Sequence, residues 1–194
     1  PDLWFRLNYK KFQMELEGAL NVGNVDFAPP GFASTPQSMQ ILNGGGVGRF
    51  SYRLLRDALN IGLEVGFATG EAAEDETGNV NFRLARRVRR PGANGQLPTM
   101  SAFTFDPDYH VDLILWRRIA GAVSNATYFK PHASYDILDN LTAAAAVIYS
   151  IANQPVGWPG NNINLGLEID ASLMYHNDEE GFYAGVAYGV LFPF

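Results

Sequence analysis

Apolar and polar residues alternate strictly along several segments of this chain. In the segment 163–176, INLGLEIDASLMYH, every second residue from Ile163 to Tyr175 is apolar, and the residues between them include Glu168 and Asp170. Successive side chains of an extended strand point to opposite faces of a sheet, so this pattern predicts a strand with one apolar and one polar face. It is also longer than the roughly 5–6 residues usual for a globular strand.

The same alternation recurs along the chain and predicts about eight strands in all. The other seven segments are 3–10, 12–23, 48–55, 60–70, 127–137, 141–151 and 181–194. The alanine-rich segment 141–151 also fits a helix. The β-branched residues Val147, Ile148 and Ile151, and the turn residues before the segment, favour a strand.

The connections between these segments alternate in length. The short ones are 9–11, 56–59, 138–140 and 177–181, and the long ones are 28–40, 72–121 and 153–162. Antiparallel pairing then places all short turns at one end of the sheet and all long loops at the other. This is the layout of an outer-membrane β-barrel. A soluble β-sandwich is the alternative, but its strands would be shorter and its loops would not sort by end.

We therefore predict an all-β chain, with residues 1–194 forming an antiparallel transmembrane β-barrel in a bacterial outer membrane and a long inserted loop at 72–121. No apolar run reaches about 18 residues, so a transmembrane helix is not expected. The net charge of −6 and the pI of about 5.0 argue against a nucleic-acid partner. The absence of cysteine decides little.

The polar faces of the predicted strands carry charges of both signs. We predict that ten charged residues face the lumen: Arg6, Glu15, Glu17, Arg49, Arg53, Glu64, Lys130, Asp136, Glu168 and Asp170. A water-filled lumen suits such a face, because an unpaired charge in a dry core is costly. A field between rows of opposite charge would orient and filter polar solutes.

The loop 72–121 begins acidic and then becomes strongly basic. Its arginines are candidates for anion binding: Arg83, Arg86, Arg87, Arg89 and Arg90. The guanidinium fork matches carboxylate and phosphate groups, so this cluster is typical of a charged pore ring or a ligand patch. The alternative is a solvated loop whose arginines pair with its own acids or with lipopolysaccharide phosphates.

The last part of that loop, FDPDYHVDLILWRRIAG at 105–121, is unusually apolar. Asp106-Pro107 is a plausible helix start, and the segment either folds into the barrel mouth or runs extended into the next strand. Asp108, His110 and Asp112 alternate, which is weak support for a metal site or a catalytic triad, and no serine is placed to complete a triad. We predict no metal, no cofactor and no catalytic site.

The order of short and long connections also indicates whether this chain contains all the strands of the barrel. If the short turns are periplasmic, both ends of the chain lie on the extracellular side, whereas such barrels begin and end in the periplasm. We expect the chain to be part of a larger barrel with strands missing at both ends. The alternative is a complete small barrel of about eight strands with reversed polarity.

Three stretches carry a resemblance to a known family. They are FTFDPDYHVDLILWRR, NATYFKPHASYDILDNLTAAAAVIYS and GFYAGVAYGVLFPF, and DPDYHVDLILW and YGVLFP are their most specific parts. Over its second half the chain resembles an outer-membrane β-barrel porin family of myxobacteria and relatives. It is more loosely similar to alginate-export-type porins. The resemblance implies a passive pore or export channel, with a further hairpin after YGVLFP, and supplies no catalytic residue.

These observations predict a non-enzymatic outer-membrane porin that passes hydrophilic solutes through a charged lumen. Membrane lipid, lipopolysaccharide and the solute are its expected partners, together with further barrel strands or other copies of the chain. A barrel that conducts nothing and acts in structure or adhesion through its extracellular loops is the second hypothesis. A hydrolase at the barrel rim is not favoured, because the sequence lacks a recognisable nucleophile constellation.

Overall fold

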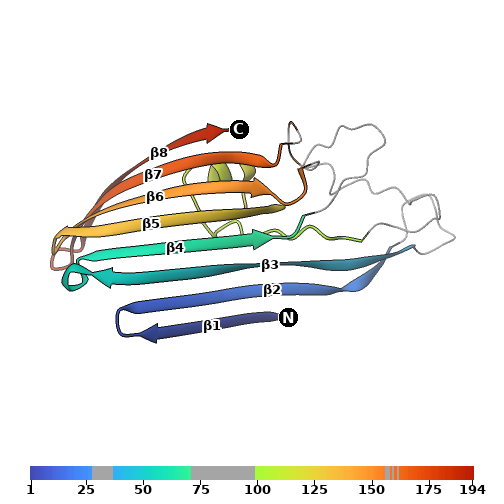
Figure 1. Ribbon diagram of the computed structural model, residues 1–194, viewed down its shortest axis with the longest axis horizontal. Helices are drawn as coiled ribbons and strands as arrows, with labels where there is room; N and C mark the ends of the chain where they lie inside the picture. The colour runs from blue at the N-terminus through green and yellow to red at the C-terminus, as the bar shows by residue number, and fades with distance from the viewer. Residues whose placement is uncertain (28–36, 71–98, 156–157, 159, 161) are drawn as a thin grey trace.

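The computed structural model describes residues 1–27, 37–70, 99–155, 158, 160 and 162–194. These residues form one antiparallel sheet of eight strands in the order β1-β2-β3-β4-β5-β6-β7-β8 (Figure 1). The strands are β1 (Asp2–Tyr9), β2 (Phe12–Phe27), β3 (Gln37–Leu54), β4 (Leu59–Ala68), β5 (Ala126–Leu138), β6 (Leu141–Ala152), β7 (Asn164–Asn177) and β8 (Phe182–Pro193). The prediction of an all-β chain with about eight antiparallel strands is confirmed. In the described residues, β1 and β8 are the edges of an open sheet.

The four short turns lie together at one end of the sheet (Figure 1). They join β1 to β2, β3 to β4 through the 3₁₀ turn η1 (Leu55–Asp57), β5 to β6, and β7 to β8. The predicted sorting of short and long connections is confirmed. However, β3 begins inside the predicted long connection 28–40, because its pairing with β2 continues out to Phe27 opposite Gln37. Polar residues near these strand ends hide the alternation that marks the rest of each strand.

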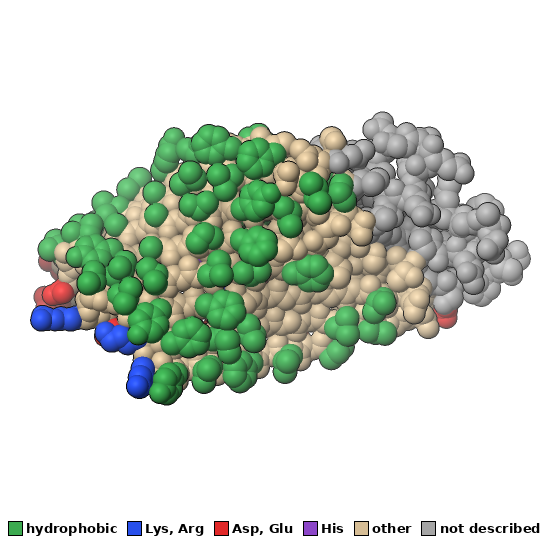
Figure 2. Space-filling view, viewed as in Figure 1, with side chains coloured by type: hydrophobic (Ala, Val, Ile, Leu, Met, Phe, Trp, Pro, Cys, Tyr) green, Lys and Arg blue, Asp and Glu red, His purple; other side chains and the backbone are tan. Residues whose placement is uncertain are grey.

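One face of the sheet is apolar and exposed, and we call it the outer face. Figure 2 shows hydrophobic side chains spread across it, with Lys, Arg, Asp and Glu side chains confined to its ends. Val186 and Tyr188 on β8 keep 65% and 69% of their surface exposed. The register aligns the apolar positions of neighbouring strands, as in Val147 opposite Ile169 and Ile169 opposite Val190. The period-two alternation in the sequence therefore becomes a continuous apolar surface.

The opposite face, the inner face, is crossed by residues 99–125, which we call the inserted segment (Figure 1, behind the sheet). It contains one turn of π-helix, η2 (Leu115–Ala120). Its residues Val111, Leu115 and Trp116 are buried and form the core together with inward side chains of the sheet. No helix in the described part of the chain is long and apolar enough to cross a membrane.

Two details differ from the sequence-based expectation. The helical turn begins at Leu115 rather than near Asp106-Pro107, because its start is stabilised by a carboxylate further along the segment, described below. Leu165 packs against the inner core cluster instead of continuing the outer face. The cause is a shift of register between β6 and β7, at Ser150 and Ile151, which disrupts the alternation there.

Close packing on the inner face depends on glycine at one central position. Gly66 on β4 lies directly opposite Tyr128 on β5, and the fully buried tyrosine ring lies over the space that a Cβ at Gly66 would occupy. An aromatic ring covering a cross-strand glycine in this way joins two strands closely.

We predict that Gly66→Ala lowers the free energy of unfolding by about 1–3 kcal/mol, because the added methyl displaces the Tyr128 ring from a packed site. Gly23→Ala is the control, since a Cβ at Gly23 meets no atom within 4 Å. Denaturant titrations followed by tryptophan fluorescence measure both variants. Equal midpoints for the two variants would contradict this account of the packing.

Candidate functional site

A row of charged side chains crosses the inner face at one level of the sheet. The register places Arg6 opposite Glu15, Glu15 opposite Arg49, Arg49 opposite Glu64, and Glu64 opposite Lys130. Five neighbouring strands, β1 to β5, thus contribute one charge each, and the sign alternates from strand to strand. We call these five residues the charge row.

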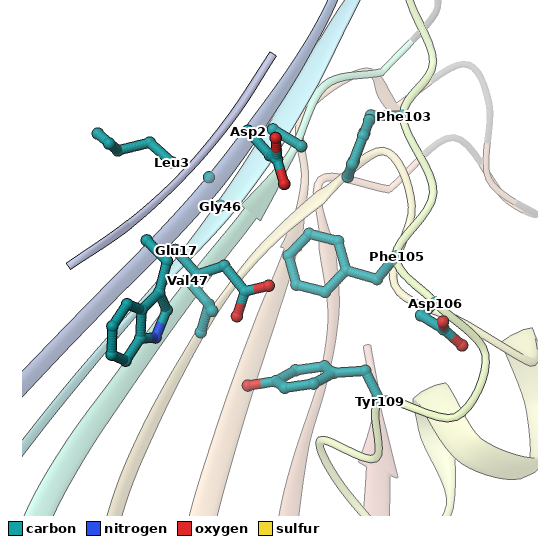
Figure 3. Close-up of a pocket in the computed structure, with 13 residues that line it drawn as sticks. Asp2, Leu3, Glu17, Gly46, Val47, Phe103, Phe105, Asp106 and Tyr109 are labelled. Carbon is teal, nitrogen blue, oxygen red and sulfur yellow. The ribbon is translucent and has the colours of Figure 1, made fainter. Parts of the chain in front are cut away.

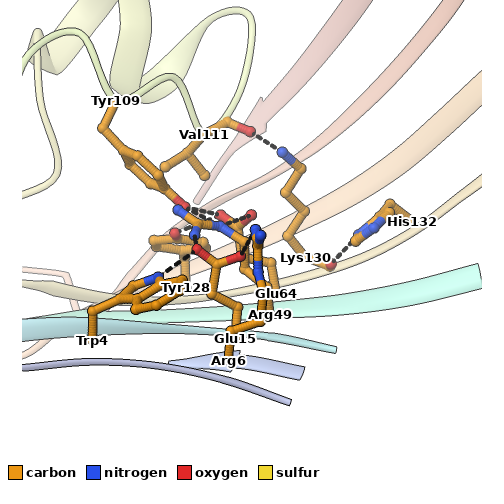
Figure 4. A network of polar contacts seen from close by, with 10 residues as sticks. All are labelled: Trp4, Arg6, Glu15, Arg49, Glu64, Tyr109, Val111, Tyr128, Lys130 and His132. Carbon is orange, nitrogen blue, oxygen red and sulfur yellow. Dashed lines mark hydrogen bonds and ion pairs between the residues drawn. The ribbon is translucent and has the colours of Figure 1, made fainter. Parts of the chain in front are cut away.

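Ion pairs join the first four members of the charge row, from Arg6 on β1 to Glu64 on β4 (Figure 4). Arg6 Nη2 lies 2.8 Å from Glu15 Oε2, and Arg49 Nη1 lies 3.4 Å from Glu15 Oε1. Arg49 Nε lies 3.5 Å from Glu64 Oε2. Opposite charges directly across neighbouring strands attract, and this fixes the positions of the side chains. Within the described sheet the charges therefore alternate along one row and do not separate into a positive and a negative row.

The inserted segment is tied to the charge row by tyrosine hydroxyls. Tyr109 donates to Glu64 Oε1 at 2.8 Å, and Tyr128 on β5 donates to the same oxygen at 2.7 Å. Arg49 Nε donates to the Tyr109 hydroxyl at 3.2 Å, and its guanidinium lies 5.0 Å from the centre of the Tyr109 ring. Burial and the nearby Glu64 carboxylate raise the pKa of Tyr109 to about 12, so the hydroxyl stays protonated and remains a donor.

A second contact holds the middle of the inserted segment. The Glu168 side chain, on β7, is fully buried, and its Oε1 accepts from the backbone N–H groups of Leu113 at 3.0 Å and Ile114 at 2.8 Å. Its Oε2 accepts from the N–H of Leu115 at 2.9 Å. We call this contact the Glu168 latch. Three charge-assisted hydrogen bonds compensate for removing the carboxylate from water.

Further bonds surround the latch. Asp170, two residues along β7, accepts from the Leu113 N–H at 3.2 Å. The buried indole N–H of Trp116 donates to Ser150 Oγ on β6 at 3.1 Å. Lys130 Nζ of the charge row donates to the Val111 carbonyl at 2.6 Å. The strands β5, β6 and β7 thus each contribute a polar side chain that binds the inserted segment.

Asp112 caps the helical turn within the segment. Its carboxylate accepts from the backbone N–H of Trp116 at 3.0 Å and 3.1 Å and from that of Arg117 at 3.2 Å. Burial raises the pKa of Asp112 to about 6. Its neighbours in the sequence pattern, Asp108 and His110, are exposed. Among the residues that the structure describes, no three His, Cys, Asp or Glu side chains gather in a way that would hold a metal ion.

The register and contacts place the ten charged residues predicted to face a lumen on the inner face. Beyond the charge row, Glu168 and Asp170 hold the inserted segment, as described above. Asp136, Arg53 and Glu17 are all exposed, and Asp136 accepts a hydrogen bond from the Thr142 hydroxyl at 2.7 Å. The predicted anion-binding arginines lie outside the described residues: Arg83, Arg86, Arg87, Arg89 and Arg90.

Sequence reasoning missed the tyrosines and the tryptophan that complete this network. Tyr128 is the one residue that carried a signal, since it is an aromatic on the otherwise polar face of its strand. Tyr109 and Trp116 lie in a loop, where no periodicity relates them to the sheet. Neither a scan against protein-family models nor a search of curated proteins returns a match to this chain. The function is therefore argued from the geometry of the inner and outer faces.

We predict that Glu168→Gln loosens the inserted segment. The amide NH₂ would face backbone N–H donors, and loss of the charge-assisted bonds costs about 1.5–3 kcal/mol. Arg117 and Arg118 are exposed, so trypsin can cleave the segment after them. We expect cleavage at these sites to accelerate roughly 10- to 100-fold, because the cleavage rate follows the population of molecules in which the segment has opened. Mass spectrometry of the fragments measures the rate.

The matched control is Glu17→Gln, which changes the same functional group at an exposed position of the inner face. It should leave cleavage after Arg117 and Arg118 unchanged. If Glu168→Gln leaves that cleavage unchanged as well, the latch does not hold the segment.

Proposed function

We propose that this chain forms the wall of an antiparallel β-barrel in a bacterial outer membrane and lines a water-filled pore for hydrophilic solutes. The observation that carries the proposal is the outer face, which is apolar, exposed and free of charged side chains except at its ends (Figure 2). An exposed apolar surface of this extent is unfavourable in water and is typical of a face that contacts lipid.

The strand lengths support the same proposal. Apart from β1, each strand has between 10 and 18 residues. A tilted strand of about 9–11 residues crosses the hydrocarbon core of a bilayer. The sorting of short turns to one end agrees with the periplasmic turns of such barrels.

The open edges β1 and β8 require a partner in this setting. Backbone N–H and C=O groups cannot stay unpaired in hydrocarbon, so a sheet in a membrane closes on itself. We infer that the barrel is completed by further strands, from a longer chain or from other copies, and that it is larger than the eight strands described. The sequence resemblance to outer-membrane porins agrees with this inference.

The inner face supports a polar passage. The charge row lies at a single level, and the inserted segment is bound beside it through Tyr109, Lys130 and Glu168. In the proposed barrel the segment narrows the lumen, and passing solutes meet the alternating charges of the row. Rings of charged side chains at a constriction are a general means of selecting solutes.

A non-conducting barrel is the second candidate, and one observation favours it. Trp116 is 1% exposed and the Glu168 side chain is fully buried, so the inserted segment is packed like a permanent part of the protein. A segment held in this way can serve as a fixed plug. The barrel would then act through its extracellular loops, in structure or adhesion.

Conductance distinguishes the two candidates. We predict that the natural full-length protein in a planar bilayer gives stable single-channel openings, and that Arg49→Gln shifts the reversal potential in a salt gradient toward cations. The reason is that Arg49 neutralises Glu15 and Glu64 in the charge row. Lys11→Gln, in the turn between β1 and β2, is the control and should leave the reversal potential unchanged. A folded but silent barrel would favour the fixed plug.

Lipid contact is testable separately, because the chain has no cysteine and accepts a unique label. A nitroxide at Val186→Cys, on the outer face, should be relaxed mainly by oxygen, which concentrates in lipid. A nitroxide at Arg53→Cys, on the inner face, should be relaxed mainly by a water-soluble nickel complex. Electron paramagnetic resonance of the protein in vesicles measures both. Equal access of the nickel complex to the two labels would exclude a lipid-facing outer surface.

A further inference from the structure

A cavity of about 190 Å³ lies between the inserted segment and strands β1, β2 and β3 (Figure 3). Phe103, Phe105 and Tyr109 of the inserted segment form one side. The opposite side is the inner face of the sheet, where Gly45 and Gly46 of β3 lie. This space is separate from the Glu168 latch and is not explained by the contacts that hold the segment.

The floor of the cavity combines small residues with larger side chains, because Gly45 and Gly46 lie there together with Trp4, Glu17 and Val47. A Cβ at Gly45 would meet the ring of Phe103, so this ring packs directly on the backbone of β3. Gly18 and Ala19 on β2 continue the same small surface. The small residues on this part of the sheet therefore leave room for the aromatic rings of the inserted segment.

The charged residues that line the cavity are all acidic, although the Arg6 and Arg49 guanidiniums lie next to it, against the rings of Trp4 and Tyr109. Its lining includes Asp2, Glu17 and Asp106 and contains no lysine, arginine or histidine. Figure 3 shows the Asp2 and Glu17 side chains directed toward Phe103 and Phe105. Among the described residues none of these three acids forms an ion pair, in contrast to Glu15 and Glu64 of the charge row, which are paired with arginines. The acids of the cavity lining are therefore not bound directly by a cationic side chain of the described residues.

The aromatic wall is continuous and already contacts cations. Phe103 and Phe105 meet edge to face with ring centres 6.0 Å apart, and Phe105 and Tyr109 do so at 5.7 Å. The Arg49 guanidinium lies 5.0 Å from the Tyr109 ring centre. On the strand side, the Arg6 guanidinium lies 5.6 Å from the ring of Trp4, which also lines the cavity. Two rings of this lining therefore hold the protein's own cations at cation–π distance.

We propose that this cavity binds a small organic cation, of the size and chemistry of a quaternary ammonium group. Aromatic faces attract a cation, the apolar wall accommodates its alkyl substituents, and the Asp2 and Glu17 carboxylates supply the complementary charge (Figure 3). A hydrated inorganic cation fits less well, because hard cations require several oxygen ligands in place of aromatic carbon. Binding at this site does not require that the barrel conduct, so the inference goes beyond the proposed pore.

The test is titration calorimetry of the natural full-length protein in detergent with tetramethylammonium chloride. The two comparison ligands are potassium chloride at equal ionic strength and the neutral isostere tert-butyl alcohol. We expect saturable binding of tetramethylammonium at one site and at least tenfold weaker binding of the other two. Equal binding of tert-butyl alcohol would mean a merely apolar cavity, and equal binding of potassium would mean general attraction of counter-ions. Either result overturns the proposal, as does the absence of tetramethylammonium binding.

Variants place the binding in the cavity. Glu17→Gln should weaken tetramethylammonium binding about three- to fivefold, the order contributed by one exposed charge. The exposed residue Glu180, in the turn between β7 and β8, provides the matched control Glu180→Gln, which should change nothing. Equal weakening by both variants would show an effect of net charge alone and overturn the assignment. Because binding is read without a membrane, a silent channel that still binds tetramethylammonium would overturn only the pore.

Discussion

The buried carboxylate of Glu168 is the interaction on which the arrangement of the inner face depends. Three consecutive backbone N–H groups, from Leu113 to Leu115, converge on its two oxygens, and these bonds fix the path of the inserted segment across the sheet. The next residue, Trp116, donates a hydrogen bond from its indole N–H to Ser150 Oγ on β6. The sheet and the segment share one polar network, so removing either leaves buried polar groups of the other without partners.

The two faces of the sheet invert the usual distribution of polarity. A soluble sheet buries its apolar face, whereas here the apolar face is exposed and the polar face carries the inserted segment. Along the charge row the sign changes with every strand, which means about every 4.8 Å. In the proposed pore, a solute near this row would therefore meet short-range dipoles between neighbours such as Arg49 and Glu64, and no broad region of one sign. In that setting the row would favour polar and zwitterionic groups through local pairing.

Much of the fold could be predicted from the sequence, because a strict period of two assigns each residue to a face. Part of the register could be predicted as well. A two-residue turn after Tyr9 places Tyr9 opposite Phe12. Three residues further from the turn on each strand, Arg6 then lies opposite Glu15. The pairing of Glu64 with Lys130 could not be predicted, because the connection between β4 and β5 is too long to set a register. The start of the helical turn was missed for a similar reason, since the capping group, Asp112, is recognisable only once the segment has folded.

Tyr109 belongs to both the charge row and the cavity on the inner face. Its hydroxyl belongs to the charge row through Glu64, and its ring lines the cavity beside Phe105. Phe103, Phe105 and Tyr109 reach the cavity only when the inserted segment is docked on the sheet. A ligand that binds these rings therefore binds the docked state alone, and by linkage it stabilises that docking to the extent of its own affinity. The Glu168 latch thus maintains the cavity wall although it contacts none of the residues in that wall.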